Sequence, residues 1–144
     1  MIEAFPEDKV FTYSIGGMRP FSGMVMEFLG MAVPGVNGIA TGAWKSVPEL
    51  WHHQKNEIPK TKQLIDRWDE ATAVIGKLWA KTSFGRFMET DQAFGEWAGP
   101  VYSFLLYWID NEIHHRGQAY VYLRSLGIEP PTFWTLAESY VKLI

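Results

Sequence analysis

The sequence predicts an all-α protein, a four-helix bundle within a single domain of residues 1–144. Apolar residues recur at helical spacing over several long segments, and no segment shows the convincing alternation of a strand. Hydrophobic residues make up 47% of the 144 residues and aromatic residues 15%, which is ample for one core. Charged residues are 20% and the formal net charge is −3, so a disordered chain is not expected.

Composition also excludes several classes of function. The chain has no cysteine, which rules out disulfides, thiolate metal ligands and a cysteine nucleophile and fits a cytoplasmic location. The slightly acidic charge offers no basic footprint for nucleic acid. We expect no signal peptide and no membrane span, because the most apolar run, residues 21–36, is interrupted by Glu27 and closed by Pro34.

The first third of the chain should hold one helix between two irregular segments. Residues 1–19 are punctuated by proline and glycine and predict an irregular lead-in. A helix should begin near Pro20 or Phe21 and end before Pro34, with an apolar face at helical spacing. Residues 34–60 then predict a long connection with one helical turn near residues 48–53.

The middle of the chain predicts an amphipathic helix over residues 61–81. One stripe of it is apolar, and its charged residues lie mostly off that stripe. The stripe consists of Leu64, Trp68, Ala71, Ile75, Leu78 and Trp79. Residues 82–99 contain several glycines and predict a second loop.

The last part of the chain predicts two more helices. A long one should cover residues 100–126, with Gly127 as its C-terminal stop. Glycine destabilises a helix interior relative to alanine, so Gly117 inside this helix needs a reason. We expect that it lets another helix approach closely. A final helix should cover residues 133–144.

His115 is the most informative residue of the long helix. Trp108 and Tyr122 lie on the same face of the predicted helix as His115, so the His115 imidazole should point into the bundle. Asn111 lies one turn before His115. A buried polar group must be paired, because an unpaired one costs roughly 1–3 kcal/mol. His115 is therefore either a hydrogen-bonded core histidine or a metal-binding or catalytic one.

Glu27 is the second unusual residue, because it is the only charged side chain between residues 21 and 36. It is either an exposed carboxylate that orients an apolar helix or an inward-facing one. An unpaired buried carboxylate would protonate. A divalent cation and a facing imidazole would keep it ionised.

Five other residues have weaker functional interpretations. Glu112 and Arg116 form an i, i+4 pair in the favourable order, which is either a surface contact or a support for the site. His114 points about 100° away from His115 and is interpreted as a rim residue. His52 and His53 are interpreted as solvent-facing, with lining of a site mouth as the alternative.

The sequence resembles the DinB-like superfamily in one specific stretch of the long helix and its exit. The residues that carry this resemblance are His115-Arg116-Gly117-Gln118, Tyr122-Leu123-Arg124 and Gly127-Ile128-Glu129-Pro130-Pro131. The segment from Arg19 to Gly30 is similar to the family's earlier metal-bearing helix. The resemblance implies a four-helix bundle and covers most of the chain.

The resemblance also implies a divalent-metal site on three histidines, often with nickel or zinc. Residue by residue, the three ligand positions fall on Glu27, Asn111 and His115, so one histidine of three is retained. Such a Glu/Asn/His set favours zinc, manganese, iron or magnesium over nickel. A metal-free pocket lined by the same residues is the alternative.

The chain departs from the family at its ends. The helix that usually precedes the segment beginning at Ile2 has no counterpart here, and an additional helix-like tail covers residues 136–144. We therefore expect a circularly permuted bundle in which the C-terminal helix fills the first-helix slot. The alternative is a helix supplied by a partner chain.

Three functions follow from the resemblance and stay open at this point. The first is a metal-dependent enzyme, a thiol transferase or hydrolase, with a small molecule or thiol as substrate and with Glu112 or His114 assisting proton transfer. The second is a non-catalytic module that binds a small ligand. The third is a stress-associated homodimer with a degenerate metal site.

Overall fold

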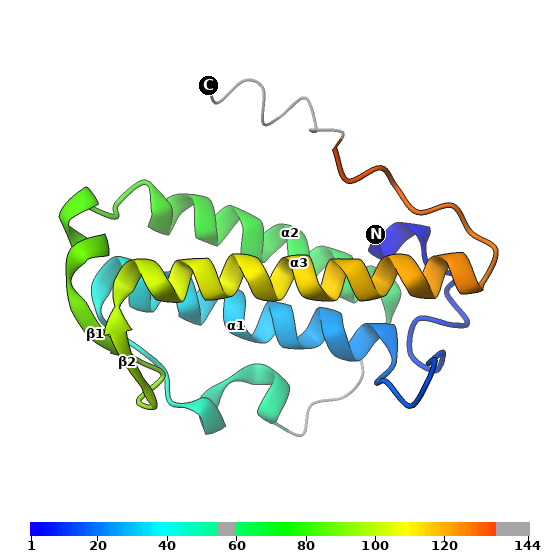
Figure 1. The fold of residues 1–144 in the computed structure, drawn as a ribbon, viewed down its shortest axis with the longest axis horizontal. Helices are drawn as coiled ribbons and strands as arrows, with labels where there is room; N and C mark the ends of the chain where they lie inside the picture. Colours follow the sequence, from blue (N-terminus) through cyan, green and yellow to red (C-terminus); the bar gives the residue numbers. More distant parts are fainter. Residues whose placement is uncertain (55–59, 135–144) are drawn as a thin grey trace.

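The computed structural model describes residues 1–54 and 60–134. Three long helices dominate this part of the chain: α1 (Phe21–Thr41), α2 (Thr61–Trp79) and α3 (Val101–Ser125). α1 and α2 run in the same direction and α3 runs antiparallel to both (Figure 1). α1 contacts both other helices, which places it at the centre of the described fold.

Shorter elements cover the two ends and one side of this helical layer. The 3-10 helix η1 (Ile2–Ala4) lies near the start of α2, and the 3-10 helices η2 (Val47–Glu49) and η3 (Trp51–His53) lie beside α1 (Figure 1). The 3-10 helix η4 (Phe84–Met88) precedes the strands β1 (Thr90–Ala93) and β2 (Trp97–Pro100). β1 and β2 form an antiparallel hairpin that pairs Thr90 with Pro100 and Ala93 with Trp97.

The sequence prediction for α1 is correct at its start and wrong at its end. The helix begins at Phe21 as expected but continues through Pro34 to Thr41. Val36 and Ile39 beyond the proline are almost completely buried. Burial of this apolar face outweighs the loss of one backbone hydrogen bond at Pro34, so the helix does not stop there. It ends at Gly42, whose φ of 75° is left-handed.

Two other features differ from the sequence prediction. Residues 82–99 are not a plain loop, because η4 and most of the hairpin lie within them. Four-residue strands are too short to show an alternating pattern, so sequence periodicity did not reveal them. Gly117 faces open space, with no atom within 4 Å of the position of an added Cβ, so it does not mediate a close helix contact.

The remaining helices follow the predictions closely. α2 buries Leu64 and Ala71 of its expected stripe. α3 ends before Gly127, whose φ of 73° makes it the expected stop. The helix expected over residues 133–144 and the permuted arrangement built on it fall on residues 135–144, outside the described part of the chain.

The main core lies where the N-terminal segment meets all three helices. Phe5 stacks on Phe21, with ring centroids 4.4 Å apart and ring planes at 4°. The irregular lead-in therefore contributes core residues as well as connecting backbone. The buried members of this core are Phe5, Val10, Phe21, Met24, Val25, Leu64, Ala119, Tyr122 and Leu123.

Candidate functional site

α1 and α3 bring Glu27 and His115 together, as the inward-facing interpretation of both residues requires. The imidazole Nε2 of His115 lies 3.2 Å from the Oε1 atom of Glu27. Their side chains are only 11% and 20% exposed. Polar groups from two helices therefore meet inside an otherwise apolar bundle.

Arg19 is the third member of this cluster, and sequence analysis did not identify it. Its guanidinium forms an ion pair with the Oε2 atom of Glu27, and its Nη2 lies 3.3 Å from the Nε2 of His115. The hydroxyl of the fully buried Tyr122 donates a 2.8 Å hydrogen bond to the Arg19 carbonyl oxygen. A glycine one turn later, Gly23, leaves room for the Arg19 side chain, since a Cβ there would lie 3.3 Å from its Cδ.

The hydrogen bonds of His115 allow two arrangements of its proton. Nδ1 is hydrogen-bonded to the Oε1 atom of Gln118 at 2.9 Å. The amide oxygen of Gln118 can only accept, so Nδ1 donates to it; Nε2 of the neutral ring then accepts from Arg19, whereas Nε2 of the imidazolium donates to Glu27. Either arrangement leaves both ring nitrogens of this largely buried imidazole paired, as a core histidine requires.

Arg19 and His115 hold Glu27 in its ionised form. Burial is the largest single influence on the Glu27 carboxyl and would raise its pKa. The hydrogen bonds and charges of Arg19 and His115 together outweigh burial, and the pKa lies below its usual 4.5. Sequence analysis expected a facing imidazole and a divalent cation to keep Glu27 ionised; the structure supplies the imidazole and adds the guanidinium of Arg19.

Asn111, the remaining predicted metal ligand, lies one turn before His115 on α3. Its Nδ2 is buried, and no described residue offers it a hydrogen-bond partner. Across residues 1–54 and 60–134, no three His, Cys, Asp or Glu side chains gather closely enough to hold a metal ion. As arranged, the side chains do not fit a divalent ion, because the Arg19 cation already contacts both Glu27 and His115.

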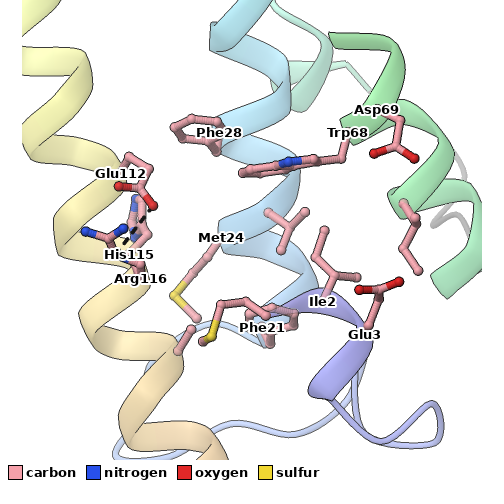
Figure 2. A pocket seen from close by; sticks show the side chains of 14 residues that line it. Ile2, Glu3, Phe21, Met24, Phe28, Trp68, Asp69, Glu112, His115 and Arg116 are labelled. Atoms are coloured by element: carbon pink, nitrogen blue, oxygen red, sulfur yellow. Dashed lines mark ion pairs between the residues drawn. The ribbon is translucent and has the colours of Figure 1, made fainter. Parts of the chain in front are cut away.

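A cavity of about 310 Å³ opens beside His115 (Figure 2). His115, Glu112 and Arg116 line one side from α3, and Phe28 of α1 and Trp68 of α2 lie across from them. The Phe28 and Trp68 rings are stacked with their centroids 5.0 Å apart. The cavity therefore combines an aromatic wall with a polar wall.

Glu112 and Arg116 form the expected i, i+4 ion pair on this polar wall. The Nε of Arg116 lies 3.6 Å from the Oε1 atom of Glu112. Both side chains are about one-third exposed, so the pair contributes little to stability. Both side chains line the cavity (Figure 2).

The other three histidines differ in their exposure. His114 and His53 are exposed, as the sequence predicts. His52 is partly buried and, with Arg19 and Glu27, lines a smaller cavity of about 260 Å³. Its position depends on Gly30, where a Cβ would lie 2.2 Å from the His52 Nδ1. In the sequence, the sign of this contact was Gly30, because a glycine inside a helix can admit a neighbouring segment. Which segment packs there becomes known only when the structure places η3 against α1.

The fold and this cluster define a class of protein: a small helical bundle with a polar centre between two of its long helices. The family model described as "DinB family" matches residues 26–142. The chain therefore belongs to the DinB family.

Solved structures agree with this assignment at the level of the fold. A DinB-like protein from Bacillus subtilis has a TM-score of 0.71 and 15% identity, with 94% of this chain and 88% of that chain covered. A DinB-like protein from Bacillus cereus ATCC 10987 has a TM-score of 0.70 and 18% identity, with 93% and 86% covered. No curated protein matches the chain.

Proposed function

We propose that this DinB-family protein binds a small molecule in the cavity beside His115, with Arg19 supplying the positive charge at the centre of the bundle. One observation carries this proposal: the Arg19 guanidinium contacts both Glu27 and His115, the residues predicted to hold a metal ion. Arg19, Glu27 and His115 balance one another's charges and hydrogen bonds without a further group. The adjoining cavity has space for a ligand.

Electrostatics favours the guanidinium over a divalent ion at this point. Two unit charges 4 Å apart near a protein surface interact with about 4 kcal/mol, and a divalent ion beside Arg19 would face about twice that repulsion. Arg19 would have to leave before an ion could bind Glu27 and His115. Tyr122 holds the Arg19 backbone through its carbonyl oxygen, and the Arg19 side chain is 45% exposed, so it has room to move.

The cavity walls indicate the chemistry of the ligand. Met24, Phe28 and Trp68 offer apolar and aromatic surface to the body of a molecule. Glu112 and Arg116 offer polar atoms on the opposite wall (Figure 2). The ligand we propose is amphipathic, with an apolar body against α1 and α2 and a polar end against α3.

A metal-dependent thiol transferase or hydrolase is the second candidate. It is favoured by the 3.2 Å approach of Glu27 and His115 and by the place of Asn111, whose amide oxygen is the atom that can ligate a metal, one turn before His115 on α3. In this candidate Arg19 swings outward, and Glu27, Asn111 and His115 hold a zinc, manganese, iron or nickel ion. A metal ion so held would leave a position open for water or a thiol.

Metal analysis separates the two candidates. Protein purified without a histidine tag should contain little metal as wild type and as His115→Ala. Arg19→Met should permit weak divalent binding, because it removes the competing charge and leaves Glu27 and His115 in place. Stoichiometric metal in the wild type that is lost in His115→Ala would instead support the enzyme and contradict the role given to Arg19.

Ligand binding is tested separately by a thermal-shift screen of small amphipathic molecules. Compounds that bind as proposed should stabilise the wild type and lose most of their effect in Arg116→Ala. The matched control is Arg124→Ala, on the same helix, whose side chain pairs with Glu129 away from the cavity. Compounds equally active on both variants would place binding elsewhere.

A further inference from the structure

The cavity beside His115 lies in a groove between α2 and α3. Both of these helices pack against α1, and they make far fewer contacts with one another than with α1. α1 therefore forms the floor of the groove, and α2 and α3 form its walls (Figure 2). A groove between two helices suits an amphipathic helix, which lays its apolar face into such a surface.

The α2 wall of this groove is apolar over much of its length. Ile65 and Trp68 line the cavity, and Trp79 follows Trp68 by eleven residues on the same face of α2. The Trp79 side chain is 45% exposed. On the floor, Phe28 stacks on Trp68 and is itself only partly buried. The apolar surface of the groove thus extends beyond the cavity beside His115.

The chain that follows α3 returns over this side of the bundle. α3 ends before Gly127, and residues 127–134 then run back along the bundle on the side opposite η2 and η3 (Figure 1). η1, which lines the cavity through Ile2, lies on that same side (Figure 1). The Tyr120 hydroxyl donates a hydrogen bond to the Pro131 carbonyl oxygen and ties the returning segment to α3. The described chain therefore ends on the side where the groove is uncovered.

The residues that come next have the sequence pattern of a short amphipathic helix. Residues 135–144 follow directly on Phe133 and Trp134, whose side chains are 64% and 70% exposed. At helical spacing, one face of this segment carries Leu136, Tyr140, Leu143 and Ile144, and the opposite face carries Glu138 and Lys142. A helix of ten residues is about 15 Å long, so it would cover about three turns of the groove.

The chain's own segment is favoured over a second copy as the occupant of the groove. A segment that begins where the described chain ends is tethered close to the groove. Tethering gives it a high effective concentration there, whereas a second copy has to associate from free solution.

From these observations we propose that residues 135–144 dock as an amphipathic helix in the groove between α2 and α3, with Leu136 and Tyr140 against Phe28 and Trp68. The docked segment covers the cavity beside His115. A ligand would enter that cavity only when the segment moves aside, a consequence that rests on the proposed function.

Paramagnetic broadening in NMR spectra tests the docking in the absence of any ligand. The chain has no cysteine, so Glu138→Cys places a single nitroxide label on the polar face of the segment. The label should remove most of the intensity of the Trp68 indole N–H resonance. The Trp44 indole, which lines a different cavity beside the hairpin, should keep its intensity. An unchanged Trp68 resonance, or equal loss at both indoles, would overturn the proposal.

Two further substitutions in the labelled protein test the orientation of the segment. Tyr140→Asp puts a charge on the apolar face and should restore the Trp68 resonance. Lys142→Asp puts the same charge on the polar face and should leave the broadening in place. The same result for both variants would contradict docking through the apolar face.

A mixed sample identifies which molecule supplies the segment. Labelled protein without isotope enrichment is added to unlabelled, isotope-enriched protein, so that only broadening between molecules is observed. We expect the Trp68 resonance to stay sharp in this mixture. Strong broadening there would show that a second copy occupies the groove and would refute docking within one chain.

Ligand access has its own measurement, so the two proposals can fail separately. A compound found in the thermal-shift screen should associate faster with Tyr140→Asp than with the wild type. Equal association rates would contradict control of access by the segment. If no compound binds either protein, the proposed function fails, and the labelling result still decides the docking.

Discussion

Gly30 controls the position of His52 through the absence of a side chain. An added Cβ would lie 2.2 Å from Nδ1 and 3.1 Å from the backbone nitrogen of His52. The ring and the backbone of η3 would both have to move. We expect Gly30→Ala to lower the free energy of unfolding by about 1–3 kcal/mol, measured by urea denaturation.

Gly76→Ala is the control for this substitution. Gly76 lies in the exposed part of α2, and nothing lies within 4 Å of its added Cβ. Alanine there should stabilise the protein by about 0.5–1 kcal/mol through helix propensity. If both variants were stabilised, His52 would not pack against α1 as the structure places it.

Glu27 should make folding stability depend on pH in a predictable direction. Its pKa in the folded protein is lowered below 4.5, so its contribution is fully present above pH 4.5 and is lost as the pH falls through the lowered value. The difference in unfolding free energy between wild type and Glu27→Gln should therefore shrink as the pH falls below 4.5.

Denaturant titrations at several pH values between 3 and 7 measure this difference. Glu129→Gln is the control, because its exposed carboxylate pairs loosely with Arg124 and should show little pH-dependent difference from wild type. A Glu27 difference that stays constant over this range would contradict the ion pair with Arg19.

At the level of elements, Arg86 holds the C-terminal end of α1 against the hairpin. Its Nε donates to the Ile39 carbonyl at 2.9 Å and its Nη2 to the Gly38 carbonyl at 3.1 Å. The same guanidinium pairs with Asp91 and Glu89. A cation at this place complements the helix dipole, and it gives a second donor to the Gly38 carbonyl, which already accepts from the Gly42 N–H.

Loss of Arg86 should therefore destabilise the end of α1 and the hairpin together. Arg86→Met should cost about 3 kcal/mol, since the side chain is only 12% exposed and Asp91 would lose its cationic partner, although the Trp44 indole still donates to it. Arg124→Met, which removes an exposed pair, should cost less than about 0.5 kcal/mol. Thermal and urea unfolding measure both, and equal costs would refute this role.

At the scale of the whole molecule, the outer face of α3 predicts self-association. Tyr102, Leu106, Ile109 and Ile113 are exposed and recur at helical spacing without a charge among them. The homodimer expected from the sequence would bury this stripe. Leu106→Glu should shift the protein to a monomer in sedimentation experiments and leave its helical content unchanged.

The control for this prediction is Thr72→Glu, an exposed position on α2 that should keep the dimer. A wild type that stays monomeric at all accessible concentrations would contradict the prediction.

α1 is apolar enough to raise the question of whether it is a membrane-spanning helix or a core helix. By length and composition alone, this helix of 21 residues with a hydropathy of 1.3 could cross a membrane. Its contacts with α2, α3 and η3 give it the surroundings of a central core helix instead. The cytoplasmic location expected from the sequence stays a prediction.

The sequence by itself determined the parts of the protein that depend on neighbours along the chain. The starts of α1, α2 and α3, the stop at Gly127 and the inward direction of His115 follow from helical periodicity and turn chemistry. Glu27 stood out because it is the only charge in an apolar stretch.

Only the tertiary structure decided which distant residues meet. Burial of Val36 and Ile39 carries α1 past Pro34, although local rules stop it there. Arg19 lies near Glu27 in the chain but meets His115 of α3 only in the folded protein, so a guanidinium lies beside two of the three predicted metal ligands. Local propensity is a property of adjacent residues, whereas these outcomes depend on free energies of contact between segments far apart in the chain.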